Sequence, residues 1–112
     1  LYVNQKPSLG SSPSVNIHSY YLASVKLLQG DYSNALNLLQ ETLRSMQSNS
    51  DINLSKAAAL SLMGSVYQDL GDYLKALSLY RQSLDIQQKL LPANHPDLSV
   101  SYNNIGFVHS AL

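Results

Sequence analysis

Apolar residues recur along this chain at spacings of three and four, a period that places them on one face of an α-helix. The helices are predicted over about residues 15–29, 32–46, 52–70, 73–91 and 97–112. The apolar face of the first is expected to hold Ile17, Tyr21, Leu22, Val25 and Leu28. That of the last is expected to hold Leu98, Tyr102, Ile105, Val108 and Leu112. The pattern therefore predicts an all-α protein.

Short polar breaks mark where these helices end and begin. Gly30 and Gly71 each stand at an expected helix end, where glycine adopts the left-handed conformation without a Cβ clash. The aspartate that follows each glycine is expected to cap the next helix through its side-chain oxygen. The other helix starts are expected at Ser14, at Ser50 or Asp51, and at the His95-Pro96 turn, where proline fits the first helical turn.

The helices also repeat as a unit. The segment Gly30-Asp31-Tyr32 returns 41 residues later as Gly71-Asp72-Tyr73. A shift of 42 residues superimposes Leu60, Met63, Gly64, Val66 and Leu70 on Tyr102, Ile105, Gly106, Val108 and Leu112. Internal periods of this size are typical of solenoids, in which each helical hairpin buries its apolar face against its neighbours.

The second repeat carries a family resemblance. The order Leu60, Met63-Gly64, Tyr67, Gly71, Tyr73, Ala76, Tyr80 resembles the tetratricopeptide repeat, and the 42-residue spacing with the segment LLPANHPDLSVSYNNIG resembles its kinesin-light-chain subtype. The resemblance covers about residues 15–112. It implies an α-α superhelix divided into a divergent first repeat, a second repeat and the first helix of a third, at 15–47, 52–91 and 97–112. Residues 1–14 are expected to form a linker or flexible tail.

Several positions depart from the family pattern. Lys26 and His109 stand where the second repeat has Tyr67, and Thr42 and Ser83 replace the usual alanine of the second helix. The third unit stops after one helix, whose apolar face is then uncovered. We expect further repeats to follow in the parent protein, and we expect residues 98–112 to fray or to mediate self-association.

The resemblance implies a concave groove, lined by the first helix of each hairpin, that holds an extended peptide. It also implies that an asparagine at the position of Asn104 holds the peptide backbone, and a carboxamide offers the donor and the acceptor that this needs. Alternatives to a groove position stay open for four residues. Asn103 and Asn104 can form a solvated helical face, Tyr21 can pack in the core, and Phe107 can be covered by a missing repeat. The groove positions are Asn103, Asn104 and Phe107 in the third repeat, Ser61, Leu62, Ser65, Gln68 and Asp69 in the second, and Tyr20, Tyr21, Ser24 and Leu27 in the first.

Charge and composition narrow the classes of partner. Seven basic residues balance seven acidic ones and are scattered, so neither nucleic acid nor an anionic membrane is expected as a partner. The groove positions include no Lys or Arg to recognise paired carboxylates, so we expect a mildly apolar peptide or protein ligand. No apolar run approaches the ~20 residues of a membrane span. The chain has no cysteine, which excludes disulfides and fits a cytoplasmic location.

No catalytic arrangement is visible in the sequence. His18, His95 and His109 are far apart, with no HExxH pair, and Ser65 follows Gly64 without a GxSxG elbow. We therefore expect no enzyme activity, no cofactor and no metal. The prediction is a protein-binding scaffold. The alternatives are the repeat portion of a larger enzyme whose catalytic domain lies elsewhere, and a purely structural or oligomerisation module.

Overall fold

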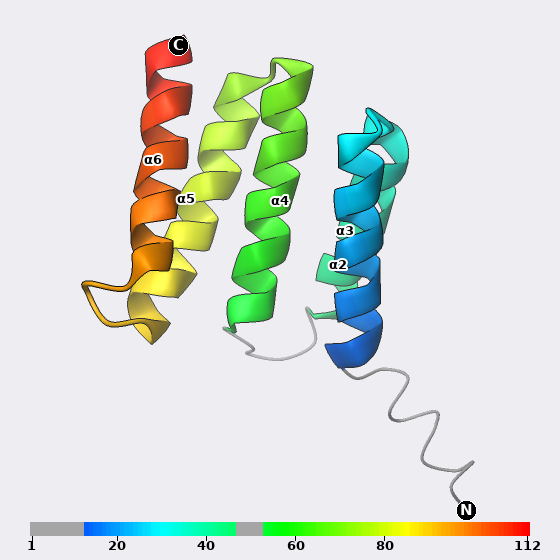
Figure 1. Ribbon diagram of the computed structural model, residues 1–112, viewed down its shortest axis with the longest axis horizontal. Coiled ribbons are helices and arrows are strands. Elements are labelled where there is room, and N and C mark those ends of the chain that lie inside the picture. Colours follow the sequence, from blue (N-terminus) through cyan, green and yellow to red (C-terminus); the bar gives the residue numbers. More distant parts are fainter. Residues whose placement is uncertain (1–12, 47–52) are drawn as a thin grey trace, which may run out of the picture.

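The computed structural model describes residues 13–46 and 53–112, and these residues form five α-helices and no strand (Figure 1). The all-α prediction is confirmed. No helix within these two ranges is both long and apolar enough to cross a membrane. The helices are α2 (Pro13–Leu28), α3 (Tyr32–Ser45), α4 (Leu54–Leu70), α5 (Tyr73–Leu90) and α6 (Pro96–Ala111).

The two Gly-Asp turns form as expected. Gly30 and Gly71 have φ of 78° and 87°, in the left-handed region that a side chain would strain. The Asp31 carboxylate accepts the backbone N–H of Asn34 at 3.5 Å, and the Asp72 carboxylate accepts that of Lys75 at 3.2 Å. Each turn therefore ends one helix and caps the next within two residues, which folds the chain into the hairpins α2–α3 and α4–α5.

Two of the three other predicted helix starts are wrong. Helix α2 begins at Pro13, so Ser14 lies inside it; a proline is well suited to the first turn because its missing N–H would have no partner there. Helix α4 is capped by Asn53, whose side chain accepts the Lys56 N–H at 2.8 Å. Ser50 and Asp51 lie outside the described residues. At α6 the prediction holds, since His95 Nδ1 accepts the Asp97 N–H at 3.0 Å.

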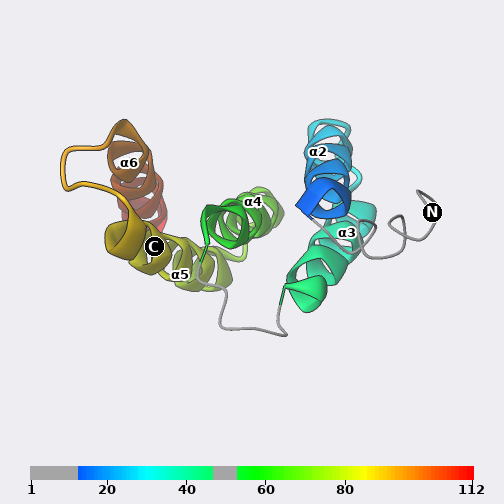
Figure 2. The same ribbon diagram turned by 90° about the horizontal axis from the view of Figure 1, so that it is seen from below.

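The helices form two layers. Viewed along the helices, α2, α4 and α6 lie on one side and α3 and α5 on the other (Figure 2). Helix α4 is set back between α2 and α6, so the three-helix layer is concave (Figure 2). The described helices thus place the first helix of every repeat on one hollowed face.

Three clusters of buried residues fill the space between the layers: two larger ones, and a smaller third one of Ala57, Leu60 and Ile86 between α4 and α5. The first joins α2, α3 and α4, and the second joins α5 and α6. Tyr67 packs against both larger clusters and so links them. The first cluster consists of Ala23, Ala35, Leu39, Ala59, Met63 and Val66, and the second of Ala76, Leu77, Tyr80 and Val108.

The predicted apolar face of α2 is wrong. Tyr21, Leu22, Val25 and Leu28 are exposed, and Leu28 retains 86% of its accessible surface. Ala23 is fully buried instead, and Leu27 packs beside it. A small side chain lets α3 come close, so the contact face follows the alanine rather than the larger residues. The side chain of Ile17 lies outside the described residues.

The predicted face of α6 is partly wrong. Leu98 and Val108 are buried and Ile105 packs against the second cluster, as expected. Tyr102 and Leu112, however, are exposed. Ser101 takes the buried position, where its hydroxyl donates a hydrogen bond to Gln87 Oε1 of α5. The packed face of α6 therefore keeps Leu98, Ile105 and Val108 as expected, and has Ser101 in place of Tyr102.

Candidate functional site

A hollow of about 250 Å³ lies where the three concave-layer helices meet. It takes side chains from α2, α4 and α6, with one residue of α5 at its floor. Because it draws on all three repeats, it exists only when the hairpins are stacked. Its lining residues are Tyr20, Ala58, Ser61, Leu62, Ser65, Gln87, Asp97, Val100 and Ser101.

A second hollow, also of about 250 Å³, lies between α2, α3 and α4. It shares Tyr20 and Ala58 with the first, so the two hollows adjoin along the concave face. We call the two together the groove. The lining of the second hollow is mainly apolar and carries no charged residue: Tyr20, Tyr21, Thr42, Met46, Leu54, Ser55 and Ala58.

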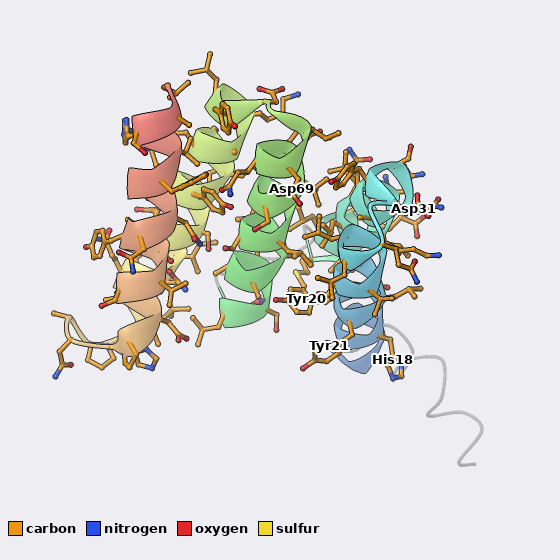
Figure 3. All side chains as sticks on the ribbon, turned by 45° about the horizontal axis from the view of Figure 1, so that its top comes forward. His18, Tyr20, Tyr21, Asp31 and Asp69 are labelled. Atoms are coloured by element: carbon orange, nitrogen blue, oxygen red, sulfur yellow. The ribbon has the colours of Figure 1, made fainter. Side chains whose placement is uncertain are left out.

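Tyr20 forms the wall between the two hollows. Figure 3 shows it reaching from α2 toward α4, with Tyr21 beside it. The two rings meet edge to face, with centroids 5.5 Å apart. Burial, with a smaller effect of neighbouring Tyr21, raises the pKa of Tyr20 above its ordinary value. Within the described residues the hydroxyl of Tyr20 makes no hydrogen bond, so it is an available donor in the groove.

Ser65 and Gln68, both predicted groove residues, are tied to α5. Tyr80 donates a hydrogen bond from its hydroxyl to Gln68 Oε1 at 2.9 Å, and Ser65 Oγ lies 3.1 Å from the same hydroxyl. Since the Tyr80 proton goes to Gln68, the single hydroxyl proton of Ser65 lies between two acceptors, the Tyr80 hydroxyl and Ser61 O, which is 3.3 Å away in the same helix. Ser65 nevertheless lines the first hollow, whereas Gln68 lines neither. This network holds the wall of α4 in a fixed rotation relative to α5.

The predicted groove residues of α6 lie beyond the hollows. Asn103 is exposed, Asn104 is half-buried and Phe107 retains 54% of its accessible surface. Asn104 and Phe107 follow Val100 by four and seven residues, which places all three on one face of the helix. They therefore extend the concave face from the first hollow toward the end of α6.

Five groove positions remain, and they divide in the same way. Leu27 packs against the first core cluster and lines neither hollow. Ser61 and Leu62 line the first hollow. Ser24 does not, and its hydroxyl donates a hydrogen bond to Tyr20 O at 3.1 Å within α2. Asp69 is exposed near the end of α4 (Figure 3), four residues after Ser65 and so on the same helical face.

Nine lining residues were not among the predicted groove positions: Ala58, Gln87, Asp97, Val100 and Ser101 in the first hollow, and Thr42, Met46, Leu54 and Ser55 in the second. Val100 had a usable signal, because it lies two helical turns before Phe107 on one face. Ala58 had another, because it precedes Val100 by one 42-residue period. Gln87 had none: it belongs to the second helix of a hairpin and reaches the groove only through the gap between α4 and α6. Its position depends on packing that periodicity does not encode.

The histidines take structural positions. His18 is exposed at the outer end of α2 (Figure 3). His95 caps α6. His109 Nε2 lies 3.2 Å from the Arg81 guanidinium, which has only donors, so the imidazole nitrogen accepts that hydrogen bond. Among the residues that the structure describes, no three metal-ligating side chains gather at one point.

Comparison with known proteins gives one finding. A family model described as tetratricopeptide repeat matches residues 55–112, a stretch that includes nearly all of α4 and the whole of α5 and α6. No curated protein matches the chain significantly. The matched stretch exceeds half of the chain and carries most of the lining of the first hollow.

Proposed function

Because this chain belongs to the tetratricopeptide repeat family, whose members generally mediate protein–protein interactions and are typically non-catalytic, we propose that it binds an extended segment of a partner protein in its groove. The observation that carries the proposal is the first hollow, to which α2, α4 and α6 all contribute. A peptide laid across it touches three repeats at once. Such a site fits a stacked array better than it fits any single hairpin.

The groove and the part of α6 that extends it each have a role in this proposal. Asn103 and Asn104 hold the backbone of the ligand, since a carboxamide pairs with both the C=O and the N–H of a peptide group. Phe107 and Val100 supply exposed apolar surface on the same helix. The Tyr20 hydroxyl donates a hydrogen bond from the opposite wall. The ligand is then bound through its backbone on α6 and through its side chains in the hollows.

A random-peptide library screened against the chain tests the proposal. The parent is compared with an Asn103→Ala/Asn104→Ala variant and with Asn37→Ala, an exposed asparagine of α3 in the other layer. We expect sequences that are enriched by the parent and by Asn37→Ala and lost by the double variant. Enrichment that ignores the double substitution would place binding outside this part of α6. No enrichment in any sample would contradict peptide binding.

A second candidate function, assembly through α6, rests on a specific contrast. The face of α4 that α5 covers includes Leu60 and Gly64, and their counterparts on α6 are Tyr102 and Gly106. Leu60 is 6% exposed and Tyr102 is 53% exposed. Self-association through this face of α6 predicts a concentration-dependent mass in sedimentation that Gly106→Arg abolishes. A monomer at all concentrations would rule it out.

Three finer statements belong to the same proposal. The 41- to 42-residue period and the 18-residue length of α5 support the kinesin-light-chain-like subtype. The contacts that chain α2 to α6 support a single repeat domain over 15–112. The absence of cysteine supports a cytoplasmic location.

A further inference from the structure

The groove is acidic although the chain as a whole is neutral. Asp97 is the single charged residue among those that line the two hollows. Asp69 adds a second carboxylate on the same face of α4, beyond Ser65. Lys56, the one basic residue of α4, lies two positions before Ala58 and hence on the opposite side of the helix. The even scatter of charge along the sequence therefore becomes uneven in the fold.

The Asp97 carboxylate has no compensating cation among the described residues. His95 Nδ1 lies 3.9 Å from Asp97 Oδ2, but the same nitrogen accepts the Asp97 backbone N–H at 3.0 Å. A nitrogen that accepts a hydrogen bond carries no proton and cannot also donate one to a carboxylate. The short contact is thus a helix cap and not an ion pair, which leaves Asp97 as a free anion at the edge of the first hollow. Asp69 likewise makes no ion pair within the described ranges.

The second hollow offers the opposite chemistry. Tyr21 and Leu54 at its rim are exposed, and Met46 and Thr42 are buried beneath them. An uncharged space of this kind admits an apolar side chain and disfavours a charged one, which would lose its water without gaining a partner. The groove therefore combines an apolar hollow with carboxylates that have no cation of their own.

We propose that the ligand of the groove is a basic, apolar peptide segment: one apolar side chain enters the hollow between Tyr21 and Leu54, and a Lys or Arg reaches Asp97. This inference rests on the proposed function and specifies its ligand. The position of α4 that corresponds to Asp97 is Ser55, and fourteen residues of helix separate it from Asp69, about 21 Å. Asp97 lies on the neighbouring helix of the layer, so an extended peptide that reaches both carboxylates covers at least that span, about six residues, and a second basic residue at least that far along the peptide meets Asp69.

Defined peptide sets test the ligand class. Three sets of peptides share one aromatic or aliphatic anchor residue and differ at the neighbouring positions, which are Lys in the first set, Gln in the second and Glu in the third. Their affinities for the chain are measured by fluorescence anisotropy at low and high salt. The parent should prefer the Lys set, and salt should reduce that preference because the charges are exposed. Asp97→Asn should weaken the Lys peptides about two- to fivefold, the range of one exposed ion pair, and leave the Gln peptides unchanged. Glu41→Gln, an exposed acid of α3, is the matched control.

The apolar part of the inference has its own variant. Ala58→Met fills the space that both hollows share without changing any charge, and circular dichroism confirms that the variant is folded. It should weaken peptides of every charge that carry an anchor. Suppose that the parent binds Lys and Glu peptides equally well and that the Asn103→Ala/Asn104→Ala variant binds neither. That result would overturn the proposed ligand class but would leave the groove as the binding site. Binding of none of these peptides to the parent would overturn both proposals.

Discussion

The two hairpins solve one packing problem with different pairs of residues. In α2–α3, Ala23 faces Leu39, and both are fully buried. In α4–α5 the equivalent pair is Gly64 and Tyr80, and a Cβ added to Gly64 would lie 2.8 Å from Tyr80 Cε1. The Tyr80 ring is larger than the Leu39 side chain, and it fits because Gly64 is smaller than Ala23. The comparison teaches that the repeat conserves the combined volume of the pair and not the identity of either residue.

A second difference separates the hairpins at their turns. Tyr67 of α4 packs against both larger core clusters and has Lys75 Nζ 4.9 Å from its ring centroid. Its counterpart on α2 is Lys26, whose Nζ lies 3.9 Å from the Asp31 carboxylate. One hairpin thus uses buried aromatic surface where the other uses a half-exposed ion pair. The family match begins at residue 55, and the first hairpin lacks the aromatic residues of the second at both positions.

Tyr67→Ala should have the largest effect on stability. Removing a half-buried ring that joins two clusters is expected to cost about 2–3 kcal/mol, below the ~3–5 of a fully buried aromatic residue. Lys26→Ala, at the equivalent position of α2, should cost less than about 1 kcal/mol because exposed ion pairs contribute little. Urea unfolding followed by circular dichroism measures both. Equal losses would mean that the two turns are not as different as their contacts indicate.

Gly64→Ala should come next, at about 1–3 kcal/mol, because the added methyl group overpacks against Tyr80. Gly106→Ala is the matched control: a Cβ there meets nothing within 4 Å, so alanine should stabilise α6 by about 0.5–1 kcal/mol. Changing the Gly64–Tyr80 pair to the Ala–Leu pair of the first hairpin tests whether the two residues compensate for each other in volume. Gly64→Ala combined with Tyr80→Leu should cost less than the sum of the single changes, as contacting residues usually do. Strict additivity would contradict the paired-volume account.

The buried hydroxyls should show a smaller contrast. Ser83 Oγ donates a hydrogen bond across the hairpin to Ala57 O at 2.7 Å, whereas Thr42 Oγ1 donates one to Leu38 O within its own helix at 2.8 Å. Ser83→Ala should therefore cost about 1 kcal/mol, the net value of one hydrogen bond. Thr42→Ser keeps the hydroxyl and tests the methyl group alone. Hydrogen exchange in α4 and α5 should rise in the Ser83 variant only.

The smallest expected effect is a pH dependence in alkaline solution. Burial raises the pKa of Tyr80, the hydrogen bond from Ser65 lowers it by a smaller amount, and the charge of Asp69 also raises it. A pKa that is higher in the folded state favours folding while the group is protonated, and this contribution is lost as pH rises from about 10 through the folded value. Unfolding free energy should fall less steeply above pH 10 in Tyr80→Phe. An equal pH dependence of the unfolding free energy in the parent and in Tyr80→Phe would contradict this prediction.

The features predicted from sequence are those set by local chemistry. The Gly-Asp turns, the His95 cap and the repeat period follow from residues within a few positions of one another. The buried faces of α2 and α6 did not follow, because periodicity gives weight to large residues, whereas Ala23 and Ser101 are buried by close helix contact. The groove positions stay a prediction; the first hollow takes side chains from α2, α4 and α6, but Gln87 enters it only through the placement of α5. The gathering of the Asp69 and Asp97 carboxylates on the concave layer did not follow either, because basic and acidic residues are evenly scattered along the sequence.

The central claim is that the concave layer, and no other surface, binds peptide. The most direct measurement is an NMR titration of the isotope-labelled chain with a peptide selected from the library. The account predicts that shift changes gather at Ala58, Ser61 and Val100 and extend toward Asn104, while Gln40 and Arg44 of α3 stay unchanged. Changes concentrated on α3 and the outer side of α5, with none at Ala58 or Val100, would contradict it.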